Sequence, residues 1–170
     1  HPIGPANQYR ATEEELPQRA YDPDKAKHHL KKAGYDSIDL KLHVGNTAFE
    51  GAVDAGVLYT ERAKPAGINI EVVREPDDGY WSNVWLVKPW SGSYWGGRPT
   101  EDWMFSQVYA DGVDWNETKW SHEQFNKILV EARAELDTNK RREMYVEMQR
   151  IVRDEGGAVI PMFSSYVQAV

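Results

Sequence analysis

The sequence predicts an α/β fold: a mixed, mostly parallel sheet with helices on both faces. Two segments alternate apolar and polar residues with a period of two, and a helical segment separates them. This strand–helix–strand order is the pattern of a right-handed parallel crossover. The last third of the chain adds two amphipathic helical patterns. At 170 residues the chain is long enough for one sizeable core.

The first 20 residues are polar, rich in Pro, Gln and Glu, and without periodicity. They are therefore predicted to form an extended or mobile connector, with the ordered domain spanning 21–170. Asp22 is a good N-cap and proline fits the first helical turn, so a helix is predicted over 23–33, ended by Gly34.

A half-buried strand is predicted over 38–44, a helix over 49–63 and a second strand over 68–73. A short helix over 77–87 and a strand-like piece at 92–95 follow. The first of these helices is expected to point three apolar residues inward: Val53, Val57 and Leu58.

The last third of the sequence is predicted to form two helices and a strand. Ser121 and Gln124 form a capping box for the first helix, and Asp137 or Thr138 caps the second, which Gly156–Gly157 ends. The inward face of the first helix is expected to include Phe125, Ile128, Leu129, Ala132 and Leu136, and that of the second Met144, Met148, Ile151 and Val152. Residues 159–163 predict a buried strand interrupted by proline.

Composition excludes several classes of function. The net charge is −7 and basic residues are scattered among acids, which argues against nucleic-acid binding. The chain has no cysteine, so disulfides and thiolate metal sites are excluded. No apolar run approaches the length of a membrane span.

Tryptophan placement is the most unusual feature of the sequence. All seven tryptophans lie within 81–120, interleaved with glycines and tyrosines. Aromatic rings on irregular backbone suit a ligand pocket. Trp81 and Trp85 have helical spacing and are expected in the core, whereas Trp95 and Trp103 flank a Gly-Gly-Arg-Pro loop and are expected to face a ligand.

Arg98 lies in this loop, between the two ligand-facing tryptophans. Its guanidinium can clamp a carboxylate or phosphate through paired hydrogen bonds. Alternatively, it pairs with Glu101 or Asp102 and holds the loop in shape. The sequence leaves both roles open.

No catalytic or metal-binding constellation is evident. Glu101 and Asp102 are sequence neighbours, whereas glycosidase carboxylates face each other across the substrate; Asp102 is a candidate cap for a helix over 103–108. His28–His29 point apart on a helix, and His43 is expected on the exposed side of a strand. The sequence also lacks phosphate-binding and nucleophile-elbow motifs. We therefore expect no enzyme activity, no cofactor and no metal.

Three segments, in this order, resemble the family 5 extracellular solute-binding proteins, the dipeptide, oligopeptide and nickel receptors of ABC importers. The resemblance spans 21–170. Its residues are Tyr21–Lys27 with Leu30 and Lys32–Tyr35, then Phe125 and Ala132–Asp137 with Lys140–Arg141, Met144–Tyr145, Met148–Gln149 and Ile151, and finally Ile160–Phe163.

The resemblance implies that residues 21–170 are the C-terminal ligand-binding lobe, of the periplasmic-binding-protein-like fold, of a longer periplasmic or lipid-anchored receptor, and that residues 1–20 connect it to the N-terminal lobe. That receptor is expected to be a monomer that closes over a small solute or peptide and docks on a membrane permease. Peptide receptors of this family carry an Asp that pairs with the peptide ammonium group. The corresponding position here is Arg98, which favours a carboxylate, phosphate or sugar hydroxyl. If the alignment shifts by three or four residues, Glu101 or Asp102 takes the peptide-pairing role.

The ligand-binding residues are therefore expected to be Trp90, Tyr94, Trp95, Gly97, Arg98, Glu101, Asp102 and Trp103. Two alternatives remain at this point: a carbohydrate-binding or carbohydrate-active module that stacks sugars on the tryptophans, and a protein-interaction module with a flat aromatic patch.

Overall fold

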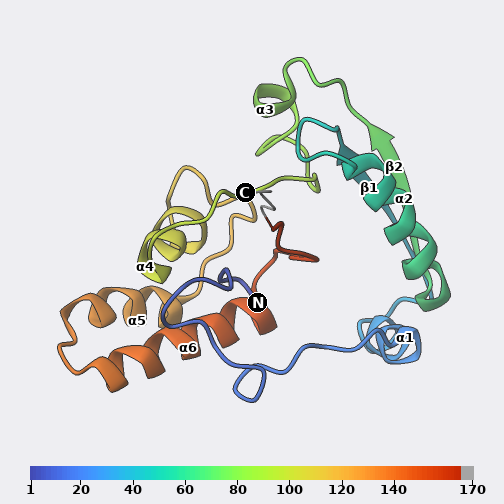
Figure 1. The fold of residues 1–170 in the computed structure, drawn as a ribbon. Helices are drawn as coiled ribbons and strands as arrows, with labels where there is room; N and C mark the ends of the chain where they lie inside the picture. The colour runs from blue at the N-terminus through green and yellow to red at the C-terminus, as the bar shows by residue number, and fades with distance from the viewer. Residues whose placement is uncertain (166–170) are drawn as a thin grey trace, which may run out of the picture. The chain divides into compact units, whose positions relative to one another are not determined.

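A computed structural model describes residues 1–165 and divides the chain into two compact units (Figure 1). Unit 1 combines residues 1–18 with the segment from Gly96 onward, and unit 2 comprises residues 19–95. The predicted mixture of helices and parallel strands is confirmed. The parallel strands lie in unit 2, and the two long C-terminal helices lie in unit 1.

Unit 2 begins with helix α1 (Pro23–Lys32), as predicted. The Asp22 carboxylate accepts a 2.8 Å hydrogen bond from the backbone N–H of Lys25, which satisfies a donor that the first helical turn leaves open. Gly34 has a φ of 92°, a left-handed conformation that glycine adopts without a Cβ clash. Local capping chemistry therefore fixes both ends of α1.

Strands β1 (Ile38–Val44) and β2 (Ile68–Arg74) pair in parallel, with Ile38 opposite Ile68. Helix α2 (Ala52–Ala63) and a 3₁₀ turn, η1 (Lys64–Ala66), connect them, which confirms the predicted crossover. α2 packs on β2. The other side of the strand pair carries exposed polar side chains at Asp39, Lys41, Asn69 and Glu71.

The buried face of α2 differs from the prediction. Val57 and Leu58 are exposed, while Ala52, Gly56 and Ala63 are buried and Val53 is partly buried. The helix approaches the sheet through its smallest residues. A Cβ added at Gly56 would lie 3.4 Å from a methyl group of Val72, which is van der Waals contact, so the backbone of α2 approaches β2 closely at this position.

The segment after β2 is less regular than predicted. Only Tyr80–Asn83 (α3) is helical within the expected helix 77–87, and Leu86 takes a positive φ of 61°, which interrupts a helix. The expected strand at 92–95 is wrong as well. A single bridge between Ser91 and His43 replaces it, and the backbone beyond is irregular.

In unit 1, α4 (Glu101–Met104) continues into a π-helical turn, η2 (Phe105–Tyr109). Thr100 caps α4, and the prediction that Asp102 would do so is wrong. Helices α5 (Glu123–Ala134) and α6 (Thr138–Glu155) then pack against each other (Figure 1). Asp137 caps α6 as predicted.

The N-cap of α5 is His122 rather than the predicted Ser121. The Nδ1 atom of His122 accepts a 3.2 Å hydrogen bond from the Phe125 N–H. The same ring stacks on Trp120 and reaches the Glu155 carboxylate, so three contacts fix it in the capping position. Tertiary contacts thus move the helix start by one residue.

The core of unit 1 lies where η2, α5 and α6 meet. Phe105 contacts Phe125 edge to face at 5.3 Å and stacks on Tyr145 at 6.3 Å. As predicted, Leu129, Ala132, Met148, Ile151 and Val152 are buried. Leu136 is exposed because α5 ends before it.

The buried strand predicted over 159–163 is wrong. This segment is irregular and most of its side chains are exposed. Within the described part of unit 1 there is no strand to pair with it, and Pro161 lacks an N–H donor. Residues 1–20 were expected to form an extended or mobile connector; this segment has no helix or strand, but its Ala11 and Leu16 side chains are buried with Val146 of α6. Their role as a connector from a preceding lobe stays a prediction.

Candidate functional site

The residues predicted to bind the ligand are divided between the two units, because the boundary falls between Trp95 and Gly96. The three from unit 2 are Trp90, Tyr94 and Trp95. The five from unit 1 are Gly97, Arg98, Glu101, Asp102 and Trp103.

In unit 2, five rings form a continuous aromatic cluster: Tyr80, Trp81, Trp85, Tyr94 and Trp95. Trp81 contacts Tyr80, Trp85 and Tyr94 edge to face, with ring centroids 5.4, 5.9 and 5.6 Å apart. Trp85 in turn contacts Trp95 at 6.4 Å. Edge-to-face contacts of this kind hold rings in defined orientations. The predicted ligand residues Tyr94 and Trp95 are thus parts of a larger ring assembly.

Tyr80 fixes this cluster to the body of unit 2. Its ring is buried, and its hydroxyl donates to the carbonyl oxygens of Gly92 at 2.7 Å and His43 at 3.3 Å. Trp81, by contrast, is 41% exposed and Tyr94 is 60% exposed. The expectation that Trp81 would be core is therefore wrong, and the cluster presents ring surface to solvent.

Trp90 has a different environment. Its half-buried ring packs against the apolar cluster of the sheet and meets Tyr59 edge to face at 5.8 Å. Burial also raises the pKa of Tyr59. These contacts tie Trp90 to the sheet.

His43 was expected on the exposed side of a strand, and this is wrong. Its ring is largely buried and its Nδ1 atom lies 2.6 Å from a carboxylate oxygen of Glu75. The backbone N–H of His43 also donates a hydrogen bond to the Trp90 carbonyl. Both the side chain and the main chain of His43 therefore fix the end of β1.

In unit 1, the Arg98 guanidinium holds its own loop. Its Nε donates a 2.6 Å hydrogen bond to Oε1 of Gln107 on η2, and its Nη1 donates to the Gly96 carbonyl at 2.9 Å. The Arg98 carbonyl accepts a bond from the Asn7 amide at 3.0 Å. The guanidinium therefore connects the Gly-Gly-Arg-Pro loop to the π-helical turn behind it.

Glu101 is buried, with 3% of its surface exposed. One carboxylate oxygen accepts a 2.6 Å hydrogen bond from the backbone N–H of Tyr9. Within residues 1–165, no basic side chain lies within ion-pair distance of this carboxylate. A buried carboxylate of this kind depends on hydrogen bonds and on the positive end of a helix.

Asp102 forms an ion pair with Arg133. Its Oδ1 accepts a 2.7 Å hydrogen bond from Nε of Arg133 on α5, and Arg133 also bonds the Ser106 hydroxyl. The Tyr145 hydroxyl lies 3.4 Å from the same oxygen. Burial and the neighbouring negative charges of Asp102 and Glu101 raise the pKa of Tyr145 to about 12.

Trp103 is 48% exposed, and a Cβ added at Gly97 would have no neighbour within 4 Å. The loop therefore presents open surface at both positions. Sequence analysis did not identify the partners that hold this loop, namely Asn7, Tyr9, Gln107 and Arg133. Asn7, Tyr9 and Arg133 are distant from the loop in sequence, and Gln107, nine residues after Arg98, lies outside any spacing pattern that indicates a contact.

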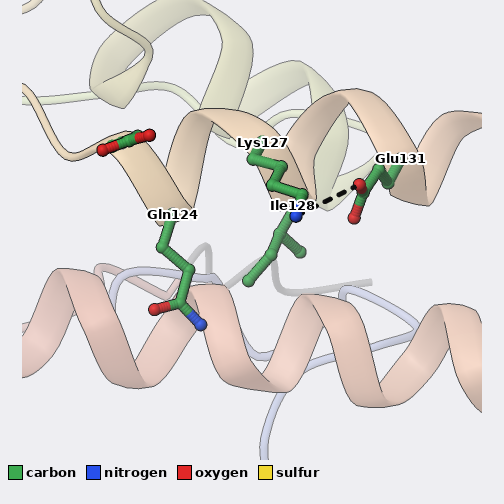
Figure 2. A pocket seen from close by; sticks show the side chains of 5 residues that line it. Gln124, Lys127, Ile128 and Glu131 are labelled. Carbon is green, nitrogen blue, oxygen red and sulfur yellow. Dashed lines mark ion pairs between the residues drawn. The ribbon is translucent and has the colours of Figure 1, made fainter.

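A shallow surface groove of about 410 Å³ lies along α5, lined by side chains of that helix alone (Figure 2). Lys127 and Glu131 form an ion pair across one turn of the helix at 3.9 Å, and Ile128 lies between them in sequence. None of the predicted ligand residues lines this groove. Its residues have ordinary helical spacing, so the groove defines no separate site.

Among residues 1–165, no three His, Asp or Glu side chains come together in a way that could hold a metal ion. The helices of this described part are also too short or too polar to cross a membrane.

Two curated proteins are similar to the chain in sequence. It is 29% identical over 166 residues to the dipeptide-binding protein of Escherichia coli, covering 88% of this chain and 30% of that protein. It is 26% identical over 155 residues to di/tripeptide-binding protein 1 of Pseudomonas aeruginosa, covering 84% of this chain and 28% of that protein. The chain thus spans less than a third of the length of these relatives. No family model matches it.

Solved structures share the fold. The chain superposes on AppA from Clostridium difficile with a TM-score of 0.76 at 20% identity, covering 89% of this chain and 32% of that one. For DppA from Helicobacter pylori in complex with the peptide STSA, the TM-score is 0.74 at 17% identity, covering 91% and 31%. NikZ from Campylobacter jejuni in complex with Ni(L-His) gives 0.67 at 17% identity, covering 77% and 30%.

These structures define the class of the chain as an α/β portion of a periplasmic-binding-protein fold. With the curated relatives, they confirm the resemblance that the sequence indicated: the chain fits part of a family 5 extracellular solute-binding protein. The relatives are binding proteins rather than enzymes, which favours the transport interpretation over the carbohydrate alternative.

Proposed function

We propose that the chain is part of the substrate-binding component of an ABC importer and captures a peptide or another small polar solute. The observation that carries this proposal is its similarity to a curated dipeptide-binding protein over 88% of its length. Binding is non-covalent and the chain has no enzymatic activity. The receptor is a monomer that works outside the cytoplasm, in the periplasm or as a lipid-anchored protein, and delivers its solute to a membrane permease.

The proposed contact residues are the eight that the sequence indicated. Exposed rings support this role at Tyr94 and Trp103, because rigid aromatic side chains provide contact area at low entropic cost. Within unit 2, Trp95 belongs to the same aromatic cluster as Tyr94, through its contact with Trp85. Trp90, whose half-buried ring packs against the apolar cluster of the sheet, is the fourth aromatic residue proposed to contact the solute.

Charge in the loop decides which polar group of the solute is bound. Arg98 is the proposed partner of an anionic group, and Glu101 is the proposed partner of a cationic one. Asp102 already has Arg133 at 2.7 Å, so its charge is largely compensated. Glu101 has no basic neighbour among the described residues, but its side chain is buried, so pairing with a ligand ammonium group requires the loop to expose this carboxylate.

Calorimetric titration tests the proposal, with the chain in its natural polypeptide and without bound solute. Dialanine, N-acetyl-dialanine and dialanine amide serve as probes: the second lacks the ammonium group and the third lacks the carboxylate. Binding of dialanine that acetylation abolishes supports Glu101 as the charge partner, and loss on amidation supports Arg98. If no probe and no larger peptide binds, capture of peptides is excluded.

A further inference from the structure

The N-terminal segment of unit 1 contacts the candidate binding loop directly. We define the strap as residues 7–11 and the loop as residues 96–104. The Asn7 amide donates a 3.0 Å hydrogen bond to the Arg98 carbonyl. Two residues later, the backbone N–H of Tyr9 donates a 2.6 Å hydrogen bond to the Glu101 carboxylate. The strap therefore bonds both a main-chain and a side-chain group of the loop.

The strap is in turn fixed to α6. Gln149 is fully buried, and its side-chain amide accepts from the Ala11 N–H at 2.9 Å and donates to the Tyr9 carbonyl at 2.8 Å. The Tyr9 ring stacks on Tyr145 with centroids 5.5 Å apart and planes 7° from parallel. A buried amide with both of its groups bonded to one backbone segment holds that segment in a defined position.

The loop needs such support because its own backbone is weakly constrained. It contains two consecutive glycines and only one short helix, and a Cβ at Gly97 would touch nothing within 4 Å. The strap and the Arg98–Gln107 bond together hold the loop from two sides. Its geometry therefore depends on residues that lie about ninety positions earlier in the chain.

We infer that the strap is a positioning element for ligand binding: Asn7 and Tyr9 hold Arg98 and Glu101 in the conformation that receives the solute. This inference rests on the proposed function of the loop. It assigns a binding role to residues that do not themselves contact the ligand. Asn7 is the most direct test because it bonds the loop through its side chain and is only partly buried.

The experiment compares three variants of the natural polypeptide that contains this chain. Asn7→Ala removes the bond to the loop, and Asn7→Gln restores an amide donor. Gln8→Ala is the matched control, because Gln8 is an exposed amide next to Asn7 and has no hydrogen bond within the described residues. Hydrogen exchange is measured at the amides of Trp103 and Met104, which are bonded to Thr100.

We expect Asn7→Ala to speed exchange at these two amides about fivefold, as loss of one hydrogen bond implies. Asn7→Gln should recover part of the protection, and Gln8→Ala should have no effect. Amides of α5 should be unchanged in all three variants, which separates local positioning from a general loss of stability. Equal exchange at Trp103 and Met104 in Asn7→Ala and Gln8→Ala overturns the inference.

Titration of the same variants with dialanine tests whether the position that the strap gives the loop also affects the affinity for the ligand. A loss of affinity of about fivefold in Asn7→Ala, with recovery in Asn7→Gln, supports the inference; unchanged affinity contradicts it. If the parent protein itself binds neither dialanine nor a larger peptide, the proposed function fails. The exchange result still decides whether the strap positions the loop, so the two failures are distinguishable.

Discussion

The guanidinium Nε of Arg98 donates a 2.6 Å hydrogen bond to the side-chain oxygen of Gln107 on the π-helical turn. This bond joins the glycine-containing part of the candidate loop to a well-packed turn of unit 1, since Phe105 and Tyr109 of that turn are buried. A guanidinium presents several donors in a fixed plane, so Arg98 bonds both the Gln107 side chain and the Gly96 carbonyl and holds the loop through more than one hydrogen bond.

Lysine cannot reproduce this geometry, because its ammonium is a point charge without a planar fork. We expect Arg98→Lys to lower the free energy of unfolding by about 1 kcal/mol. Arg74→Lys, at an exposed position of unit 2, is the control and should change it by less than about 0.5 kcal/mol. Denaturant titration measures both variants. Equal stability of the two variants would show that Arg98 does not hold the loop.

The ion pair between Glu15 and Arg142 should make stability depend on pH. Arg142 donates two hydrogen bonds to the Glu15 carboxylate, at 2.5 and 2.7 Å, and this lowers the pKa of Glu15 from 4.5 to about 2. A lowered folded-state pKa favours the charged form. The stabilisation is therefore present above pH 4.5 and is lost as the pH falls toward 2.

The Glu15→Gln variant tests this dependence. It should be less stable than the parent above pH 4.5 by about 1 kcal/mol or less, because solvent screens the pair, and the difference should vanish near pH 2. Glu14→Gln, at an exposed neighbouring position, is the control. A difference between parent and Glu15→Gln that stays constant across this range would contradict the assignment.

Gly67 should tolerate alanine less well than Gly34. Both have a positive φ, of 83° and 92°, so alanine costs about 1–2 kcal/mol at either site. At Gly67 the new Cβ would also lie 2.9 Å from the Asp36 carbonyl oxygen, whereas at Gly34 it would meet nothing within 4 Å. Denaturant unfolding should show the larger loss for Gly67→Ala. Equal losses would mean that the close contact is relieved without cost.

The Tyr80 hydroxyl should stabilise unit 2. It is buried and bonds two carbonyl oxygens, so Tyr80→Phe leaves two acceptors without this donor and should cost about 1–3 kcal/mol. Tyr94→Phe serves as the control, since that residue is 60% exposed. Thermal unfolding followed by tryptophan fluorescence compares them. If both variants unfold at the same temperature, the Tyr80 hydrogen bonds add nothing.

Local sequence signals predicted the regular elements well. Asp22 with a following proline located α1, and period-two alternation located both strands, because capping and burial on one face depend on nearby residues. Predictions failed where a tertiary contact decides the outcome. Val57 and Leu58 are exposed, and α2 instead meets the sheet at Gly56, beside Val72.

The surroundings of the candidate site were less predictable for the same reason. Tryptophan density indicated the aromatic region, but nothing in the spacing places Asn7 or Tyr9 beside a loop about ninety residues later. Likewise, the Asp102–Arg133 pair spans 31 positions and two helices. Trp81 was assigned to the core from helical spacing, whereas the short α3 leaves it at the surface.

The central claim is that the chain serves the capture of a small solute. It is tested most directly by purifying the natural polypeptide that contains the chain without added ligand, denaturing it, and identifying the released compounds by mass spectrometry. The account predicts that short peptides or another small polar solute are released in near-stoichiometric amount. A variant with both Tyr94→Ala and Trp103→Ala should release much less. No released solute, together with no binding of peptides by the emptied protein, would contradict the account.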